Sequence, residues 1–120
     1  MIVYRVENNE SSGPYQNSLD WIHRFSLHNA PMRPQPGSEF ETYELGNFKR
    51  GIHLSAFKDM KSLFRWFVKK ERKELHSRGF KIALYEVHEN CVLNGKKQVA
   101  FDHRFAKVIN KISLSQSLNY

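Results

Sequence analysis

Apolar and polar residues alternate in several short segments of the chain, and a period of two predicts β-strands. The segment IVYRV, residues 2–6, has the β-branched and aromatic content of a strand. Within about residues 40–54, FETYEL and GIHLS predict one or two further short strands. These patterns place strands both at the start of the chain and immediately before its most aromatic segment.

The C-terminal third has a similar alternation, interrupted by turn signals. Gly79 is suited to a left-handed helix stop, and FKIALYEV, residues 80–87, follows it as the clearest strand in the sequence. A turn is predicted at Asn94-Gly95, with strands after it in KQVAF and FAKVINKISL. The terminal SQSLNY is expected to fray. Three strands are therefore predicted in this part of the chain.

From Ser55 onward the apolar period changes to about 3.6, which predicts an amphipathic helix with Ser55 as its N-cap. The helix is expected to break near Val68-Lys69, before a second helical segment in ERKELHS. One face is apolar and comprises Met60, Leu63, Phe64, Phe67 and Val68. A separate face is basic and comprises Lys58, Lys61, Arg65, Lys69 and Arg72.

The segment between the first strand and residue 40 is rich in turn formers. SLDWIHRFSLH has helical spacing and predicts a helix over about residues 19–28, while NAPMRPQPGSE contains closely spaced prolines and predicts a loop or closing flap. The resulting order is strand, loop, helix, long loop, two strands, two helices and three strands. This order predicts one α+β domain over residues 1–120, with a mostly antiparallel sheet and two to three helices.

Composition places this domain among soluble proteins. Hydrophobic residues make up 40% of the chain, but no apolar run approaches the roughly 20 residues that span a membrane. The N-terminus lacks the basic start and longer apolar middle of a signal peptide, and the single cysteine, Cys91, is compatible with a reducing compartment. A cytoplasmic protein is therefore expected.

Charge is distributed unevenly along the chain. The net charge is +7, yet residues 1–48 carry three arginines against six acids, whereas residues 49–120 carry sixteen lysines and arginines against six acids. Such asymmetry favours an anionic partner. The basic face at residues 58–73 is either a phosphate-binding stripe or a solvated helix face, and weak, non-specific nucleic-acid binding is the expectation, since its aromatic neighbours have core spacing.

Recognised catalytic and metal-binding motifs are missing from the sequence. There is no P-loop, dinucleotide fingerprint or G-x-S-x-G, so Ser55 is not predicted to be a nucleophile. His88, Cys91 and His103 provide the nearest approach to a metal-ligand cluster, but their spacing is not that of a zinc site. No metal site is predicted.

Three segments in order, YRV with Arg5, GIHLSAFKDMKSLFRWF and KKQVAF, resemble small ADP-ribosyltransferase-like domains. The combination of GPY, a Trp-Phe helix, GF and QVAF is also similar to small uncharacterised phage and prophage proteins. The transferase resemblance implies a nicotinamide dinucleotide, NAD, as the ligand. It implies that Arg5 contacts the ribose or phosphate, that His53 and Ser55 line the nicotinamide end, and that Gln98 occupies the catalytic glutamate position.

The amide at Gln98 departs from the pattern of the transferases. A carboxylate there would stabilise the positive charge that develops as the glycosidic bond breaks, whereas an amide provides only a hydrogen bond. The sequence therefore predicts a phage-type accessory protein of the host cytoplasm that binds a nucleotide or a host protein rather than catalysing efficiently. An active transferase using Glu86 or Glu89, and a nucleic-acid-binding module, remain the alternatives.

Overall fold

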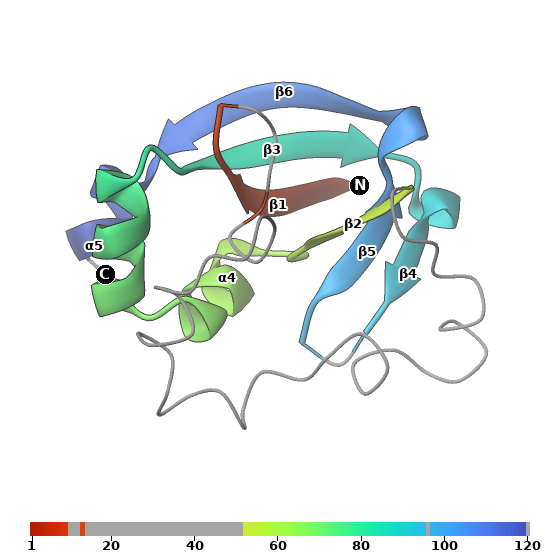
Figure 1. The fold of residues 1–120 in the computed structure, drawn as a ribbon. Helices are drawn as coiled ribbons and strands as arrows, with labels where there is room; N and C mark the ends of the chain where they lie inside the picture. Colours follow the sequence, from red (N-terminus) through yellow and green to blue (C-terminus); the bar gives the residue numbers. More distant parts are fainter. Residues whose placement is uncertain (10–12, 14–51, 96, 120) are drawn as a thin grey trace.

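A computed structural model describes residues 1–9, 13, 52–95 and 97–119, and it has an α+β architecture (Figure 1). Two three-stranded antiparallel sheets form its framework. The first has the order β1-β3-β6, and its strands are β1 (Ile2–Glu7), β3 (Lys81–Val87) and β6 (Ala106–Ser113). The second has the order β2-β5-β4, and its strands are β2 (His53–Ala56), β5 (Val99–Asp102) and β4 (Val92–Asn94).

The two sheets meet at a backbone bridge between Tyr4 in β1 and Phe57, the residue after β2. The Tyr4 N–H donates to the Phe57 carbonyl oxygen, and the Phe57 N–H donates back to Tyr4, both at 2.8 Å. Neighbouring strands consequently follow one another from β6 through β3, β1, β2 and β5 to β4. The bridge also fixes where the chain leaves β2 for the helices.

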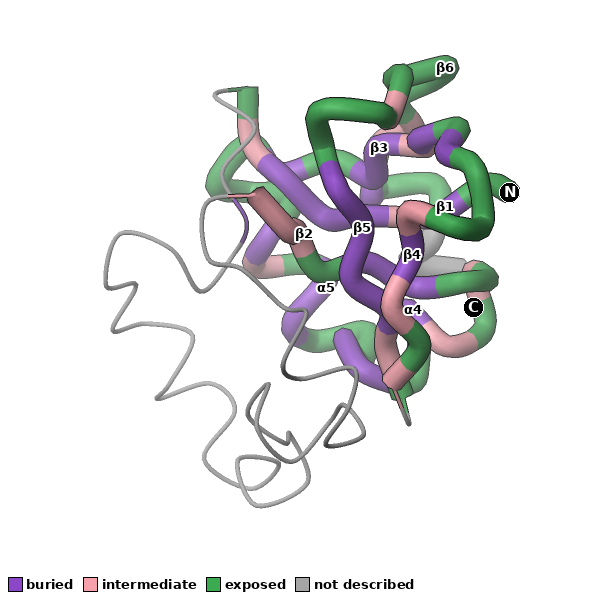
Figure 2. The backbone as a smooth tube through the Cα atoms, turned by 90° about the vertical axis from the view of Figure 1, so that its right-hand side faces the viewer, coloured by how far each residue is buried: buried purple, intermediate pink, exposed green. Residues whose placement is uncertain are grey.

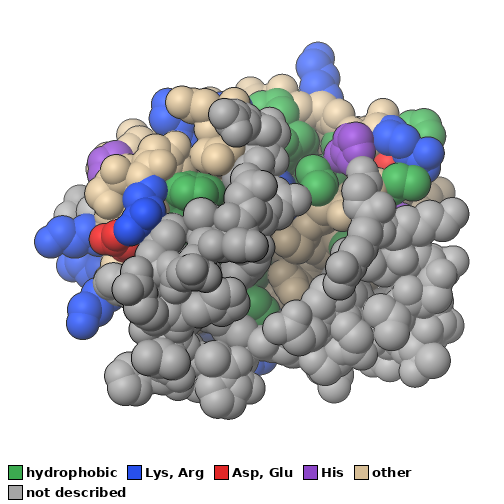
Figure 3. Space-filling view, viewed as in Figure 1, with side chains coloured by type: hydrophobic (Ala, Val, Ile, Leu, Met, Phe, Trp, Pro, Cys, Tyr) green, Lys and Arg blue, Asp and Glu red, His purple; other side chains and the backbone are tan. Residues whose placement is uncertain are grey.

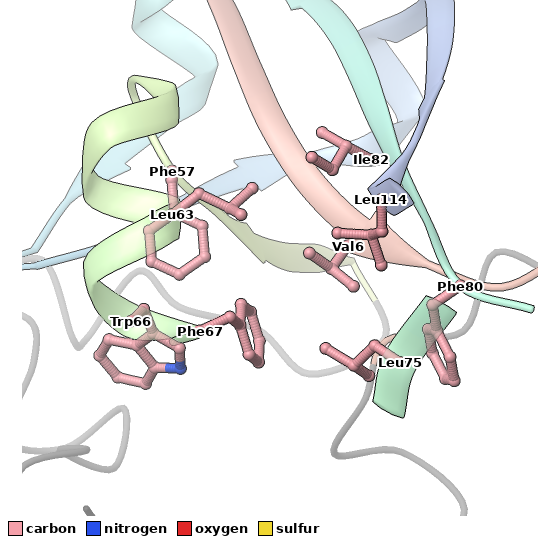
Figure 4. Close-up of a cluster of buried hydrophobic side chains, with 9 residues drawn as sticks. All are labelled: Val6, Phe57, Leu63, Trp66, Phe67, Leu75, Phe80, Ile82 and Leu114. Carbon is pink, nitrogen blue, oxygen red and sulfur yellow. The ribbon is translucent and has the colours of Figure 1, made fainter. Parts of the chain in front are cut away.

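One hydrophobic cluster packs the helices α4 (Met60–Trp66) and α5 (Lys69–Ser77) against the first sheet (Figure 4). The ring of Phe57 lies 5.8 Å from that of Trp66 and 6.1 Å from that of Phe67, measured between centroids. Both aromatic residues of the helix end are buried, as their core spacing predicted. The whole cluster comprises Val6, Phe57, Leu63, Trp66, Phe67, Leu75, Phe80, Ile82 and Leu114.

A second hydrophobic cluster lies between the two sheets. Its centre is Phe101 in β5, which is fully buried, with its ring 4.9 Å from that of Tyr85 in β3. The first sheet contributes Val3, Ala83, Tyr85 and Val87, and the second contributes Ala56, Val92, Val99 and Phe101. The alternation of side chains along β3 accounts for this arrangement, because successive residues face opposite sides of the sheet.

The ends of the helices confirm one prediction and correct another. Asp59, not Ser55, caps α4: its Oδ1 accepts from the Ser62 N–H at 2.7 Å, while Ser55 lies within β2. The prediction failed because Ser55 extends the strand, which delays the helix by several residues. The predicted break near Val68-Lys69 is confirmed, since α5 begins at Lys69 and the Val68 N–H donates to Oε1 of Glu71 at 3.3 Å.

Most strands predicted within the described residues are present, and Gly79 has the expected positive φ of 85°. The short strand β4 was not predicted. Residues 115–119 of the segment expected to fray lie in the 3-10 helix η4 (Leu114–Asn119), and Leu114, immediately before them, is fully buried. The predicted strand FETYEL, the helix over residues 19–28 and the proline-rich loop lie outside the described residues. Within the described residues, no helix is long and apolar enough to cross a membrane.

The inter-sheet cluster can be tested with two phenylalanines close in sequence. Phe101→Ala should lower the free energy of unfolding by about 3–5 kcal/mol, because it leaves a cavity in a fully buried position. Phe105→Ala is the control, since that side chain is 64% exposed and should change stability by about 0.5 kcal/mol or less. Urea unfolding of both variants measures the difference, and equal losses would contradict this account of the core.

Candidate functional site

An open groove of about 530 Å³ lies across α4 and the start of α5. Phe64 and Val68 provide its apolar surface, and the other described residues of the lining are all basic: Lys61, Arg65, Lys69 and Arg72. Four of the five residues predicted to form a basic face therefore converge on one groove. The fifth, Lys58, precedes α4 and lies outside the lining.

Helix geometry explains why these side chains converge. Lys61, Phe64 and Arg65 are three or four residues apart, so they lie on one side of α4. The chain then leaves the helical conformation at Phe67 and Val68, and α5 begins in a new direction. Its first turn presents Lys69 to the same groove. The break between the helices thus makes a concave surface from what a continuous helix would display as a straight stripe.

Arg72 connects the two helices from inside this surface. Its Nη1 donates to the carbonyl oxygens of Phe64, at 3.2 Å, and Phe67, at 2.7 Å, so it satisfies acceptors at the C-terminal end of α4. The guanidinium carbon also lies 4.5 Å from the centroid of the Phe64 ring. Arg72 is only 2% exposed, and burial lowers its pKa. Of the five residues predicted to form the basic face, Arg72 is thus buried against α4 rather than exposed to solvent.

Lys61, Arg65 and Lys69 are the exposed basic residues of the groove. Figure 3 shows lysine and arginine side chains gathered over the α5 end of the molecule. Phe64 is half-buried at the groove surface, so an aromatic ring does lie among the basic residues. The sequence analysis assigned Phe64 to the apolar core face because of its spacing, and so did not predict this position.

The residues predicted to form a nucleotide cleft lie elsewhere, and three of the four come together. Arg5, Ser55 and Gln98 line a cavity of about 20 Å³, which is closed mainly by apolar side chains of the helix cluster. His53 is outside its lining and pairs with Asp102 across β2 and β5. A cavity of this size has room for about one water molecule, whereas pockets for small ligands usually measure about 300–1,000 Å³.

Arg5 is held by a buried polar network rather than facing open space. Its Nε contacts Oε2 of Glu7 at 3.2 Å, and its Nη1 donates to the Ser55 carbonyl oxygen at 2.8 Å. The Tyr85 hydroxyl donates to the Glu7 carboxylate, lying 2.9 Å from each oxygen. Burial lowers the pKa of Arg5, and the adjacent Glu7 carboxylate opposes that shift. These contacts join β1, β2 and β3.

Glu7 and Tyr85 are the site residues that sequence reasoning missed. A signal for Glu7 existed, because Arg5 and Glu7 are two residues apart in a strand and therefore project from the same face. Tyr85 could not be assigned without the pairing of β1 with β3. Gly13 packs closely beside them: a Cβ on Gly13 would lie 3.0 Å from Nη2 of Arg5.

The carboxylates considered as substitutes for a catalytic glutamate are exposed and lie outside the lining of the cavity at Gln98. Glu86 is in β3, and Glu89 begins the 3-10 helix η2 (Glu89–Cys91). Among residues 1–9, 13, 52–95 and 97–119, there is no cluster of three or more His, Cys, Asp or Glu side chains suited to a metal ion.

A partly buried ion pair between Asp102 and Arg104 lies at the C-terminal end of β5. Asp102 accepts from the backbone N–H of Arg104 at 3.0 Å, and its carboxylate oxygens lie 2.9 Å from Nε and 2.6 Å from Nη2 of the same arginine. Hydrogen bonding from the Arg104 side chain is the main cause that lowers the pKa of Asp102 to about 2. The pair anchors the 3-10 helix η3 (His103–Phe105), which leads into β6.

The chain belongs to a class of bacteriophage proteins. The chain is a member of the bacteriophage T4 Y00F protein family, whose profile matches residues 1–115. It is also 33% identical over 73 residues to the "Uncharacterized 19.7 kDa protein in motB-dexA intergenic region" of Enterobacteria phage T4. That alignment covers 61% of this chain and 44% of the relative, so the chain spans less than half of the relative's length.

No solved structure matches the chain. The family assignment confirms the predicted similarity to phage proteins. The ADP-ribosyltransferase-like organisation has no such support and stays a prediction.

The buried Arg5–Glu7 pair should affect the free energy of unfolding much more than a partly exposed pair does. Glu7→Gln leaves the Arg5 charge buried without its counter-charge and should lower the free energy of unfolding by about 3–5 kcal/mol. Glu74→Gln is the matched control, because the Glu74–Arg78 pair is partly exposed and should contribute about 1 kcal/mol or less. Chemical unfolding measures both, and similar losses would show that the Arg5 network is not a structural centre.

The lowered pKa of Asp102 predicts a pH-dependent contribution to stability. Since its ordinary pKa is about 3.9, the stabilisation is complete above that pH and is lost as the pH falls toward 2. The parent protein should therefore exceed Asp102→Asn in stability near neutral pH, with a difference that shrinks between about pH 4 and pH 2. Unfolding curves across this range, with Arg104→Gln as a second variant, would reject the assignment if the difference stayed constant.

Proposed function

We propose that this phage protein binds single-stranded nucleic acid in the groove between α4 and α5. The observation that carries the proposal is the position of three exposed basic side chains around an apolar floor that includes an aromatic ring. Lysine and arginine neutralise phosphates, and an aromatic ring offers a surface for a base. Single-stranded nucleic acid presents phosphates and unpaired bases side by side, in repeating order.

The open shape of the groove and the charged side chains around it support a chain-like ligand. Among the described residues, the groove is open and lies on the surface of two short helices, as a site for a strand must be. Around it, the acidic side chains Asp59 and Glu71 are engaged, one as the α4 cap and the other at the α5 start. The exposed charges of Lys61, Arg65 and Lys69 are therefore available to an anion.

A nucleotide such as NAD is a second candidate for the same groove. The volume of about 530 Å³ falls within the usual range for small-molecule sites, whereas the cavity beside Arg5, Ser55 and Gln98 does not. Phosphates would contact the basic residues and the base would rest on the floor. Binding rather than catalysis is proposed in either case, because the described residues that line the groove include no carboxylate.

The proposed affinity is modest and strongly dependent on salt. Neutralising about three phosphates of a single strand gives a slope of about −2 for the logarithm of the association constant against the logarithm of salt concentration. Dissociation constants of about 10⁻⁴ to 10⁻⁶ M at physiological salt are typical of this sequence-independent mode. The setting we propose is the cytoplasm of the bacterial host.

The proposal predicts that fluorescein-labelled oligothymidylate binds and that its affinity falls with added salt. Lys61→Ala, Arg65→Ala and Lys69→Ala should each weaken binding and flatten the salt slope by about 0.7. Phe64→Leu should weaken binding with little change in that slope, because it removes a stacking surface but no charge. Fluorescence anisotropy at several salt concentrations measures each variant.

Lys111→Ala provides the matched control, since Lys111 is exposed on β6 and outside the groove. The proposal requires this variant to retain nearly the parent affinity. If all four charge variants lost the same affinity, binding would reflect net charge alone and the groove would be rejected. A parallel titration with NAD distinguishes the second candidate, whose binding should also fall in Lys61→Ala and Arg65→Ala.

A further inference from the structure

Arg72 holds Phe64, the aromatic residue of the groove, by both its backbone and its ring. Nη1 of Arg72 donates to the Phe64 carbonyl oxygen at 3.2 Å, and the guanidinium carbon lies 4.5 Å from the centroid of the Phe64 ring. The same nitrogen donates to the Phe67 carbonyl oxygen at 2.7 Å. Because a guanidinium group is planar and rigid, these contacts fix the ring relative to the end of α4.

Arg72 and Phe64 differ in what they offer to a ligand. Figure 2 shows that α4 and α5 each carry buried and exposed positions, and Arg72 is 2% exposed whereas Phe64 is half-buried. A phosphate therefore finds almost no surface of Arg72 to contact, while part of Phe64 is accessible in the groove. Arg72 can influence a bound strand chiefly through the residues that it holds.

We propose that Arg72 is a positioning residue, which holds the Phe64 ring ready for an unpaired base and does not itself contact a phosphate. The inference rests on the proposed function of the groove and specifies its ligand, which is an unpaired base flanked by phosphates rather than any polyanion. Unpaired bases of single strands stack on aromatic side chains, whereas the bases of a duplex are stacked on one another.

Fixing the ring before a ligand arrives lowers the entropic cost of binding. A phenylalanine side chain on a surface turns about two torsion angles, and ordering such a side chain on binding opposes association. The Arg72 cation is attracted to the electron-rich face of the Phe64 ring and restricts this motion in the unbound protein. Loss of that contact should weaken the stacking of a base but leave the phosphate contacts of the exposed basic residues unchanged.

Arg72→Lys separates the shape of the arginine side chain from its charge. Lysine keeps the positive charge and can donate to a carbonyl oxygen, but its ammonium group has no plane to lie against the Phe64 ring. The net charge of the protein and its long-range attraction for an anion are therefore unchanged in this variant. A change in affinity then reports the position of the ring.

The experiment compares two fluorescein-labelled strands of equal length, oligothymidylate and an abasic strand that has the same sugar-phosphate backbone without bases. Fluorescence anisotropy at low salt measures both. Arg72→Lys should weaken oligothymidylate binding about two- to tenfold, with an unchanged salt slope, and should bind the abasic strand as the parent does. Phe64→Leu should show the same pattern, and the double variant should bind no more weakly than Phe64→Leu alone, because Arg72 acts through the ring.

Lys69→Ala is the matched control, since it removes an exposed charge of the groove. It should weaken the binding of both strands and flatten the salt slope by about 0.7. Unfolding curves check that each variant folds. If Arg72→Lys does not fold, Arg72→Gln takes its place, because glutamine keeps a planar donor group and should show the same selective loss.

Three results would overturn the inference. Equal weakening of both strands by Arg72→Lys would show a general structural role, a flatter salt slope would show a phosphate contact, and additive losses in the double variant would show that Arg72 does not act through Phe64. If the parent binds neither strand, the proposed function of the groove itself fails. If the parent binds both strands and Arg72→Lys binds oligothymidylate equally tightly, only the positioning role of Arg72 fails.

Discussion

The buried contact between Arg5 and Glu7 determines how the rest of the structure is assembled. Arg5 extends from β1 and donates a hydrogen bond to the backbone of β2, and Glu7 accepts a hydrogen bond from the Tyr85 hydroxyl of β3. Because burying a charge without a partner is very unfavourable, these groups favour one relative position of the three strands. The Tyr4–Phe57 bridge lies beside this network and directs the chain toward α4. The point at which the chain enters α4 is therefore fixed beside this polar contact in the sheet.

Periodicity predicted much of this framework because the hydrophobic pattern directly records which side of an element is buried. The strand FKIALYEV and the apolar face of α4 are examples, and both contribute to the described core. The short β4 escaped prediction because three residues are too few to establish a period. Ser55 was misassigned as a cap because strand pairing with β5 outweighs its capping preference, and Asp59 provides the cap instead.

The sites were less predictable because their geometry depends on contacts between distant residues. Sequence resemblance identified Arg5, Ser55 and Gln98, and these residues do share a cavity, but only folding reveals that its volume is about 20 Å³. The basic residues of α4 and α5 had the sequence spacing of a basic helix face. Neither the bend between the helices nor the inward position of Arg72 follows from that spacing, since the bend lies in the extended backbone of Phe67 and Val68 and Arg72 contacts carbonyl acceptors that the end of α4 exposes.

Arg72 and Lys111 illustrate why net charge alone is a poor guide to binding in this family member. Arg72 is committed to Phe64 and Phe67 and stabilises the groove's shape, whereas Lys111 is exposed on an apolar edge strand. The charge of +7 is thus divided among structural, groove and strand-edge positions. Electrostatic attraction favours the approach of an anionic partner, but the surface next to each charge decides which partner fits, and an aromatic ring beside exposed basic side chains is a feature that suits bases.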